Sequence, residues 1–263
     1  MSREPLLHEK IDGVGVMRLN RPEVLNALNE PLLRGLLAGL EAAARDEAIR
    51  CIVITGSGRA FSTGADLDAL SAMGKTEFRE YIGLLQRLSA EMRRLAKPSI
   101  AAVNGYALAG GFELALVCDI RIAADTALFG LPDTPIGLSP TSGLTYLLPR
   151  IVGMGWAKHL TFTAETIDAR QAERIGLVTR VVPTAELDRV SRDVARAVAG
   201  HPSTGVRYAK LGLDVAADVD FHAALISEAE AEVTCFDTEE VRANIRAFLA
   251  RRKAKRRAEP PSA

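Results

Sequence analysis

The sequence predicts an α/β fold, in which short strands alternate with longer helices. Short runs rich in β-branched residues recur between stretches with helical spacing of apolar residues, at a roughly constant interval through residue 130. The letters themselves do not repeat, so this regularity indicates a structural repeat rather than a sequence repeat. The composition agrees, because 48% apolar and 25% charged residues over 263 positions are typical of a globular protein with a sizeable core.

Strands are predicted where short apolar runs end at residues that break a strand. The uncharged run CIVIT at 51–55 is followed by Gly56-Ser57-Gly58, which is typical of a strand buried on both faces. The run at 14–19 follows an Asp12-Gly13 turn. We expect strands over residues 14–19, 51–55, 99–103 and 120–124.

Helices are predicted where apolar residues recur every three or four positions. Over 31–45 the leucines form one apolar face, and Asn29 or Glu30 is available near the cap. A second helix over 76–95 is closed by Lys97-Pro98. Beyond Thr141 the character becomes mainly helical. We expect further helices over 142–148, 156–163, 168–174, 185–199, 221–236 and 239–257.

The break at Gly200-His201-Pro202 predicts two parts of the chain. We expect a core over residues 1–200 and a helical region over residues 201–263 that ends in a basic tail. The only dense charge run, at 251–257, suits the C-terminal end of a helix dipole. Because 33 basic residues balance 33 acidic ones, there is no wider basic surface and no nucleic-acid partner is expected.

The cysteines and the lengths of the apolar segments indicate in which cellular compartment the protein is expected. Cys51, Cys118 and Cys235 lie far apart, which argues against a disulfide framework and against a structural metal site. A reducing cytoplasm is therefore expected. The N-terminal residues lack an apolar signal region, and no apolar stretch reaches membrane-spanning length, so neither secretion nor a membrane partner is expected.

The most informative segment is VNGYALAGGFEL at 103–114. A strand runs into Gly110 and Gly111 and then into a helix, so main-chain N–H groups at the helix start are unpaired and accessible to a ligand oxygen. Glu113 falls in the first helical turn beside the same opening. The alternative is that the glycines only permit close packing and that Glu113 is a helix cap.

A second segment, GRAFSTGADL at 58–67, also follows a buried strand and ends at a helix start. If neighbouring strands deliver both segments to one sheet edge, one N–H from each could bind a single carbonyl oxygen. That arrangement is an oxyanion hole. Taken alone, this segment is a turn in which Asp66 caps a helix.

A third segment, FGLPDTPIGL at 129–138, carries Asp133 between Pro132 and Pro135, 20 residues after Glu113. Two carboxylates that face one site can divide acid and base roles, because mutual repulsion separates their pKa values. The alternative for Asp133 is a turn residue that faces solvent.

These segments, in this order, resemble the enoyl-CoA hydratase/isomerase (crotonase) superfamily. Further matching stretches are LNRP and LNAL at 19–28, PRIVG at 149–153 and IDA at 167–169, so that the resemblance spans about residues 6–257. It implies a spiral of repeated ββα units with a C-terminal helical region that packs on its own or a neighbouring subunit. It also implies a homotrimer or a dimer of trimers that binds acyl-CoA thioesters with no metal and no cofactor, because coenzyme A is part of the substrate.

The resemblance also implies roles for individual residues. The N–H groups of Ala65 and Gly110 would polarise the thioester carbonyl, and Glu113 and Asp133 would form the acid/base pair. The residues at the entrance for coenzyme A would be Arg21, Pro22, Glu23 and Val24. Those along the adenine end would be Ala65, Asp66, Leu67 and Asp68. Arg251 or Lys253 would reach the phosphates of coenzyme A.

Some residues depart from the family pattern. Asp133 is one methylene shorter than the glutamate of the hydratases, and SPTSG at 139–143 replaces a more glycine-rich turn. Thr141 stands where some isomerases carry an aspartate, and Asp68 stands where a lysine could pair with coenzyme A. The expected activity is a lyase, an enoyl-CoA hydratase. The alternatives are double-bond isomerisation on the same fold and acyl-CoA binding without turnover.

Overall fold

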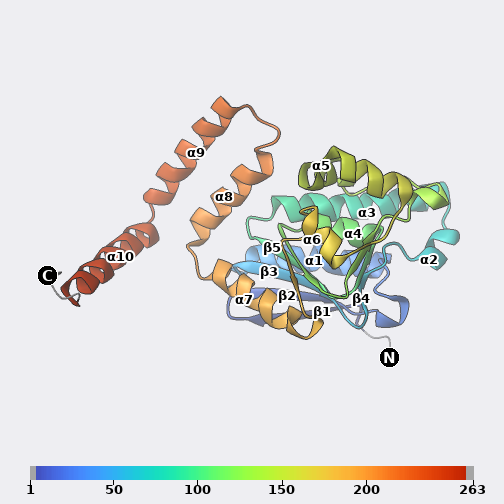
Figure 1. The fold of residues 1–263 in the computed structure, drawn as a ribbon, viewed down its shortest axis with the longest axis horizontal. Helices are drawn as coiled ribbons and strands as arrows, with labels where there is room; N and C mark the ends of the chain where they lie inside the picture. The colour runs from blue at the N-terminus through green and yellow to red at the C-terminus, as the bar shows by residue number, and fades with distance from the viewer. Residues whose placement is uncertain (1–3, 259–263) are drawn as a thin grey trace. The chain divides into compact units, whose positions relative to one another are not determined.

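The computed structural model describes residues 4–258, and for residues 254–258 the backbone only. The chain forms two compact units, Met1–Gly200 and His201–Ala263, each of which is described by itself (Figure 1). The first unit contains all of the strands among the described residues. The second unit is helical.

A six-stranded sheet forms the centre of the first unit. In order across the sheet, the strands are β1 (Leu6–Ile11), β2 (Val14–Leu19), β3 (Cys51–Gly56), β5 (Ser99–Val103), β7 (Ile120–Ala124) and β10 (Arg180–Val182). The β1–β2 pair is an antiparallel hairpin, and every other neighbouring pair is parallel. The four strands predicted from sequence are confirmed. The hairpin strand β1 was not predicted, because five of its six side chains are exposed and the apolar signal is weak.

A second sheet supplies the other strand of each repeat. It contains β4 (Ala60–Ser62), β6 (Tyr106–Leu108), β8 (Leu128–Gly130) and β9 (Ile167–Asp168), in that order. Successive windings of the chain place one strand in each sheet and then a helix, as in β5–β6–α4. The structure therefore confirms the expected ββα repeat. The strands of this sheet are only two or three residues long, which is too short for the sequence pattern to reveal.

Helices cover both faces of the main sheet. The helices of the first unit are α1 (Glu30–Arg45), α2 (Leu67–Ser71), α3 (Lys75–Arg94), α4 (Gly110–Val117), α5 (Leu144–Thr163), α6 (Ala169–Arg174) and α7 (Leu187–Ala199). The Asn29 side chain accepts the N–H of Leu32 and caps α1, as expected. Two helices predicted over 142–163 are the two halves of α5, which is interrupted at Gly153 with φ of 78°.

The main sheet is buried on both faces, which explains its uninterrupted apolar strands. Alternate side chains such as Val53 and Ile100 pack against α7. The intervening ones, such as Ile54 and Ala101, belong to the larger core beneath α1, α3 and α4. Because β3 is covered on both sides, all six of its residues are buried. This covering fixes the strand ends from which the loops of the site emerge.

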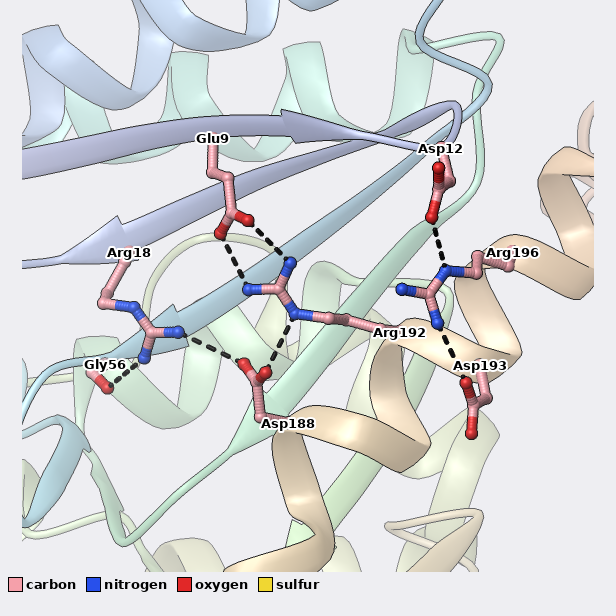
Figure 2. Close-up of polar contacts among 8 residues, drawn as sticks. All are labelled: Glu9, Asp12, Arg18, Gly56, Asp188, Arg192, Asp193 and Arg196. Atoms are coloured by element: carbon pink, nitrogen blue, oxygen red, sulfur yellow. Dashed lines mark hydrogen bonds and ion pairs between the residues drawn. The ribbon is translucent and has the colours of Figure 1, made fainter.

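Arginine ion pairs fasten α7 to the sheet hairpin (Figure 2). Arg192 donates two hydrogen bonds to Glu9 on β1, at 2.9 and 2.7 Å, and a third to Asp188 at 2.9 Å. Asp188 also accepts a hydrogen bond from Arg18 on β2 at 3.2 Å. Only 15% of the Arg192 side chain is exposed, so it joins three charged groups under partial shelter from water.

We expect Arg192→Ala to lower the free energy of unfolding by about 1–2 kcal/mol, because a two-point arginine–carboxylate pair and the packing of its stem are lost together. Chemical denaturation of the variant measures this. The control is Arg189→Ala, whose arginine is 63% exposed and pairs with Glu186 and Asp193 on the same short stretch of chain. Its effect should stay within about 0.5 kcal/mol, and equal losses in both variants would contradict the fastening role of Arg192.

The second unit comprises α8 (Ser203–Val215), α9 (Phe221–Phe236) and α10 (Glu239–Ala258). The structure confirms α9 and α10 and adds α8, which was not predicted. Large apolar side chains are exposed on these helices in the single chain, among them Leu213, Phe221, Val233, Phe236 and Phe248. The expected trimer stays a prediction. Within the described residues, no helix combines the length and apolar character needed to cross a membrane.

Candidate active site

A cavity of about 310 Å³ in the first unit gathers the residues singled out in the sequence. Ala65, Gly110, Glu113 and Asp133 all line it. Its apolar wall comes from Leu70, Phe78, Ile82, Leu85 and Leu138. A larger groove of about 640 Å³ lies between α1 and α3, but it contains neither the paired carboxyl groups nor the glycine loops. We therefore place the candidate site in the smaller cavity.

Ala65 and Gly110 come from distant segments and lie side by side. A β-carbon added at Gly110 would be 3.5 Å from Cα of Gly64 and 3.9 Å from the nitrogen of Ala65. Gly64 allows this approach: its φ is +87°, and a β-carbon there would be 2.8 Å from the nitrogen of Gly110. The structure thus brings the two segments together, as the parallel strands predict.

The main-chain N–H groups of Ala65 and Gly110 have no acceptor within the bridge or the helix to which each residue belongs. Gly110 is the first residue of α4, and the first N–H groups of a helix have no carbonyl partner within it. Ala65 pairs with Leu28 in a parallel bridge, in which Leu28 donates to Gly64 and accepts from Asp66. In such a bridge the N–H of the intervening residue points to the opposite edge.

Glu113 is buried in α4 with only 2% of its surface exposed. Its Oε1 accepts the N–H of Thr141 at 2.6 Å, and the Ser142 hydroxyl also bonds to the carboxyl group. Within the described residues, Oε2 is buried and has no hydrogen-bond partner. Burial raises the pKa of Glu113, the bonds from Thr141 and Ser142 oppose that rise, and the negative charge of Asp133 adds to it.

Asp133 is half-buried at the start of a short 3₁₀ turn, Thr134–Ile136. Its carbonyl oxygen accepts the N–H groups of Ile136 and Leu138, at 3.2 and 3.0 Å, which fixes the turn. In the described part of the chain, its Oδ2 is buried and lacks a hydrogen-bond partner. Burial raises the pKa of Asp133. The alternative of a solvent-facing turn residue is therefore wrong, and each carboxyl group has one oxygen available to a ligand.

Several residues that line the cavity were not predicted as site residues. Tyr81 lines the cavity and donates its hydroxyl to the carbonyl of Leu28 at 2.9 Å. Tyr81 lies on α3 with Phe78, Ile82 and Leu85, at helical spacing that marks one face. This periodicity was visible in the sequence, but it does not distinguish a cavity wall from ordinary core.

The residues expected to hold coenzyme A are only partly brought together. Arg21 pairs with Asp66 at 3.1 Å, and Pro22 packs against Gly58. Glu23 and Val24 are exposed in the 3₁₀ turn Pro22–Val24, as are Leu67 and Asp68 at the start of α2. Arg251 is exposed on α10 in the second unit. Contacts of these residues with coenzyme A stay predictions.

Comparisons with known proteins agree with this fold. The sequence model of the family "Enoyl-CoA hydratase/isomerase" matches residues 9–257, and the chain belongs to that family. It is 39% identical to a crotonyl-CoA hydratase of Syntrophomonas wolfei, over 97% of this chain and 98% of that one. It is 38% identical to a short-chain-enoyl-CoA hydratase of Clostridium acetobutylicum, over 96% and 97%. The crystal structure of an enoyl-CoA hydratase from Bacillus anthracis superposes with a TM-score of 0.92 at 33% identity, covering 94% of this chain and 96% of that one.

We expect Ser142→Ala to raise the pKa of Glu113 further, because the lost hydrogen bond stabilises the charged carboxylate. Infrared titration of the carboxyl band measures this, with Glu113→Gln used to assign the band. The matched control is Ser139→Ala, which removes an exposed hydroxyl from the same segment. An unchanged titration in the Ser142 variant would show that its hydroxyl does not stabilise the carboxylate.

Proposed function

We propose that the protein is an enoyl-CoA hydratase, which adds water reversibly across the double bond of a 2-enoyl-CoA. The observation that carries this proposal is the common cavity of two carboxyl groups and two residues, Ala65 and Gly110, whose main-chain N–H groups have no acceptor in the bridge or helix to which they belong. The names of the similar proteins support the same reaction. The apolar wall formed by residues of α2 and α3 suits a hydrocarbon acyl chain.

The two N–H groups supply the electrostatic part of the mechanism. When water adds to the β-carbon, negative charge passes to the thioester oxygen and an enolate forms. The N–H groups of Ala65 and Gly110 donate to that oxygen. Donors that are fixed before the reaction need no reorganisation when the charge develops, and removal of one typically costs about 10²–10³ in rate.

The two carboxyl groups divide the proton transfers. Glu113, which accepts bonds from Thr141 and Ser142, starts as the carboxylate and takes a proton from water as the oxygen bonds to the β-carbon. Asp133 starts protonated, which its buried Oδ2 favours, and delivers its proton to the α-carbon. The enolate electrons form the new C–H bond and the carbonyl returns. Proton exchange with solvent then restores both groups.

This reaction uses no metal and no redox cofactor, and coenzyme A enters as part of the substrate. No group of three His, Cys, Asp or Glu side chains in the described residues could hold a metal ion. A homotrimer or a dimer of trimers remains part of this proposal. It is supported by the apolar surface that the helices of the second unit expose in a single chain.

Hydration is tested directly by incubation of the protein with crotonyl-CoA and longer 2-enoyl-CoA thioesters. We expect the absorbance of the conjugated thioester to fall and mass spectrometry to show a product heavier by one water. A rise of that absorbance from a 3-enoyl-CoA, with no change of mass, would assign isomerisation instead. Binding without any chemical change would assign an acyl-CoA-binding protein.

Glu113→Gln should lower kcat for hydration by about 10²–10⁴-fold, because the amide retains the shape but cannot accept the proton of water. The dissociation constant for a saturated acyl-CoA thioester, measured by calorimetry, should stay within about twofold, since the amides that bind the thioester oxygen are untouched. Hydration at the wild-type rate would exclude Glu113 as the base.

The pH profile of kcat/KM should be bell-shaped, because hydration needs Glu113 ionised and Asp133 protonated. Activity falls on the acid side as Glu113 takes up a proton and on the alkaline side as Asp133 loses one. Because burial raises the pKa of both groups, both limbs should lie above the ordinary values of 4.5 and 3.8. Steady-state rates between pH 4 and pH 10 measure this, and an acid limb at or below pH 4.5 would contradict the role assigned to Glu113.

A further inference from the structure

We propose that Arg21 and Asp66 are positioning residues that hold the Ala65 amide in place for the developing oxyanion. This inference rests on the proposed function and replaces the expected role of the Arg21 side chain as a contact of coenzyme A. Both terminal nitrogens of the Arg21 guanidinium donate to Oδ2 of Asp66, each at 3.1 Å. Asp66 directly follows Ala65, so the ion pair acts on the next peptide unit.

The same guanidinium also bonds to the segment that pairs with Ala65 in the bridge. Its Nη1 donates to the carbonyl of Ala27 at 2.6 Å, and Ala27 precedes Leu28, the bridge partner of Ala65. The two main-chain bonds of the bridge measure 2.7 Å, from Leu28 to Gly64, and 3.4 Å, from Asp66 to Leu28. The longer bond is the one donated by Asp66, the residue with which Arg21 pairs.

The backbone of Arg21 is itself anchored. Its N–H donates to Oδ1 of Asn26 at 2.9 Å, and Asn26 is completely buried. The amide nitrogen of Asn26 donates to the carbonyls of Ala60 and Ser57, at 2.7 and 2.9 Å, on the segment that leads to Ala65. Arg21 and its target segment therefore share one anchor, which fixes the backbone from which the guanidinium extends.

The ion pair between Arg21 and Asp66 is partly buried, so that it can restrain the backbone beside it. The side chains of Arg21 and Asp66 are 18% and 17% exposed, which favours a stronger interaction than an exposed surface pair gives. The second oxygen of Asp66 accepts the N–H of Ala69 at 3.3 Å and caps α2. Loss of Arg21 would remove the ion pair that, together with this cap, holds the partly buried carboxylate, and with it a restraint on the backbone next to the Ala65 amide.

The test compares Arg21→Ala, Asp66→Asn and the double variant in steady-state hydration of crotonyl-CoA. We expect kcat to fall about 10–100-fold in each, less than the effect of losing a whole donor, because the amide is misdirected but remains present. KM and the calorimetric dissociation constant for coenzyme A should stay within about twofold. The double variant should lose no more than the worse single variant, because both act through one contact.

The infrared carbonyl band of bound butyryl-CoA, a saturated thioester, gives a readout that needs no turnover. Hydrogen bonds to the carbonyl oxygen lower its stretching frequency, so each variant should show a smaller downward shift than the wild type. Arg21→Lys, which keeps the charge but not the two-pronged contact, should recover part of the shift. Circular dichroism establishes that each variant is folded.

Arg34→Ala is the matched control, because Arg34 forms an exposed pair with Glu30 outside the cavity and should leave kcat and the carbonyl band unchanged. Unchanged kcat in Arg21→Ala, together with a raised KM and weaker binding of coenzyme A, would overturn the proposal and restore the contact role. If the wild type polarises butyryl-CoA but does not hydrate crotonyl-CoA, the proposed hydratase function fails and the positioning role stands.

Discussion

The close approach of Gly64 to the start of α4 is the contact on which the site depends. It places two amides from segments 45 residues apart, Ala65 and Gly110, beside each other at the mouth of one cavity. Only a residue without a β-carbon fits this approach at Gly64, where φ is positive and a side chain would meet Gly110. The ββα winding makes the contact possible, because it places the two segments after neighbouring parallel strands, β3 and β5.

The second constraint on the site is the burial of Glu113, because removal of a carboxyl group from water disfavours its charged form. Every residue of α4 after Gly110 is buried, and only 2% of Glu113 is exposed. The N–H of Thr141 and the hydroxyl of Ser142 bond to the carboxyl group and oppose the rise of the Glu113 pKa that burial causes. Ser142 takes φ of 54°, which is uncommon for a residue with a side chain, and this conformation accompanies the bond to Glu113. The segment at 139–143 thus holds the Glu113 carboxyl group, in addition to lining the cavity.

Continuous apolar runs revealed the main strands, and apolar residues at helical spacing, as in α1, revealed several of the helices. Strands such as β5 and helices such as α9 agree with the structure at both ends. The strands of the second sheet could not be predicted, because two or three residues carry no period and form only when the main sheet places them together. The helix α8 was missed as well, because it begins directly after the Gly200-His201-Pro202 break and contains Gly205 and Gly212, which disfavour a helix.

Part of the candidate site could also be predicted, from local motifs and the family resemblance rather than from apolar patterns. Local pattern identified Gly110, Glu113, Asp133 and the segment at 58–67 as candidates, and the family resemblance then singled out Ala65 and assigned a role to each residue. The role of Arg21 could not be derived from sequence, because its partner Asp66 is 45 positions away and each residue has an ordinary local explanation. Contacts between loops depend on the whole winding of the chain, which no local window contains.

The shorter acidic residue at 133 does not remove the carboxyl group from the cavity. Asp133 lines the same space as Glu113, and its Oδ2 is sheltered from solvent. The turn that follows is fixed by Pro135 and by Gly137 in the left-handed region, so the backbone sets where the side chain begins. Both carboxyl groups of the proposed acid/base pair therefore line one cavity, and the aspartate at 133 alone is no argument for a protein that binds acyl-CoA without turnover.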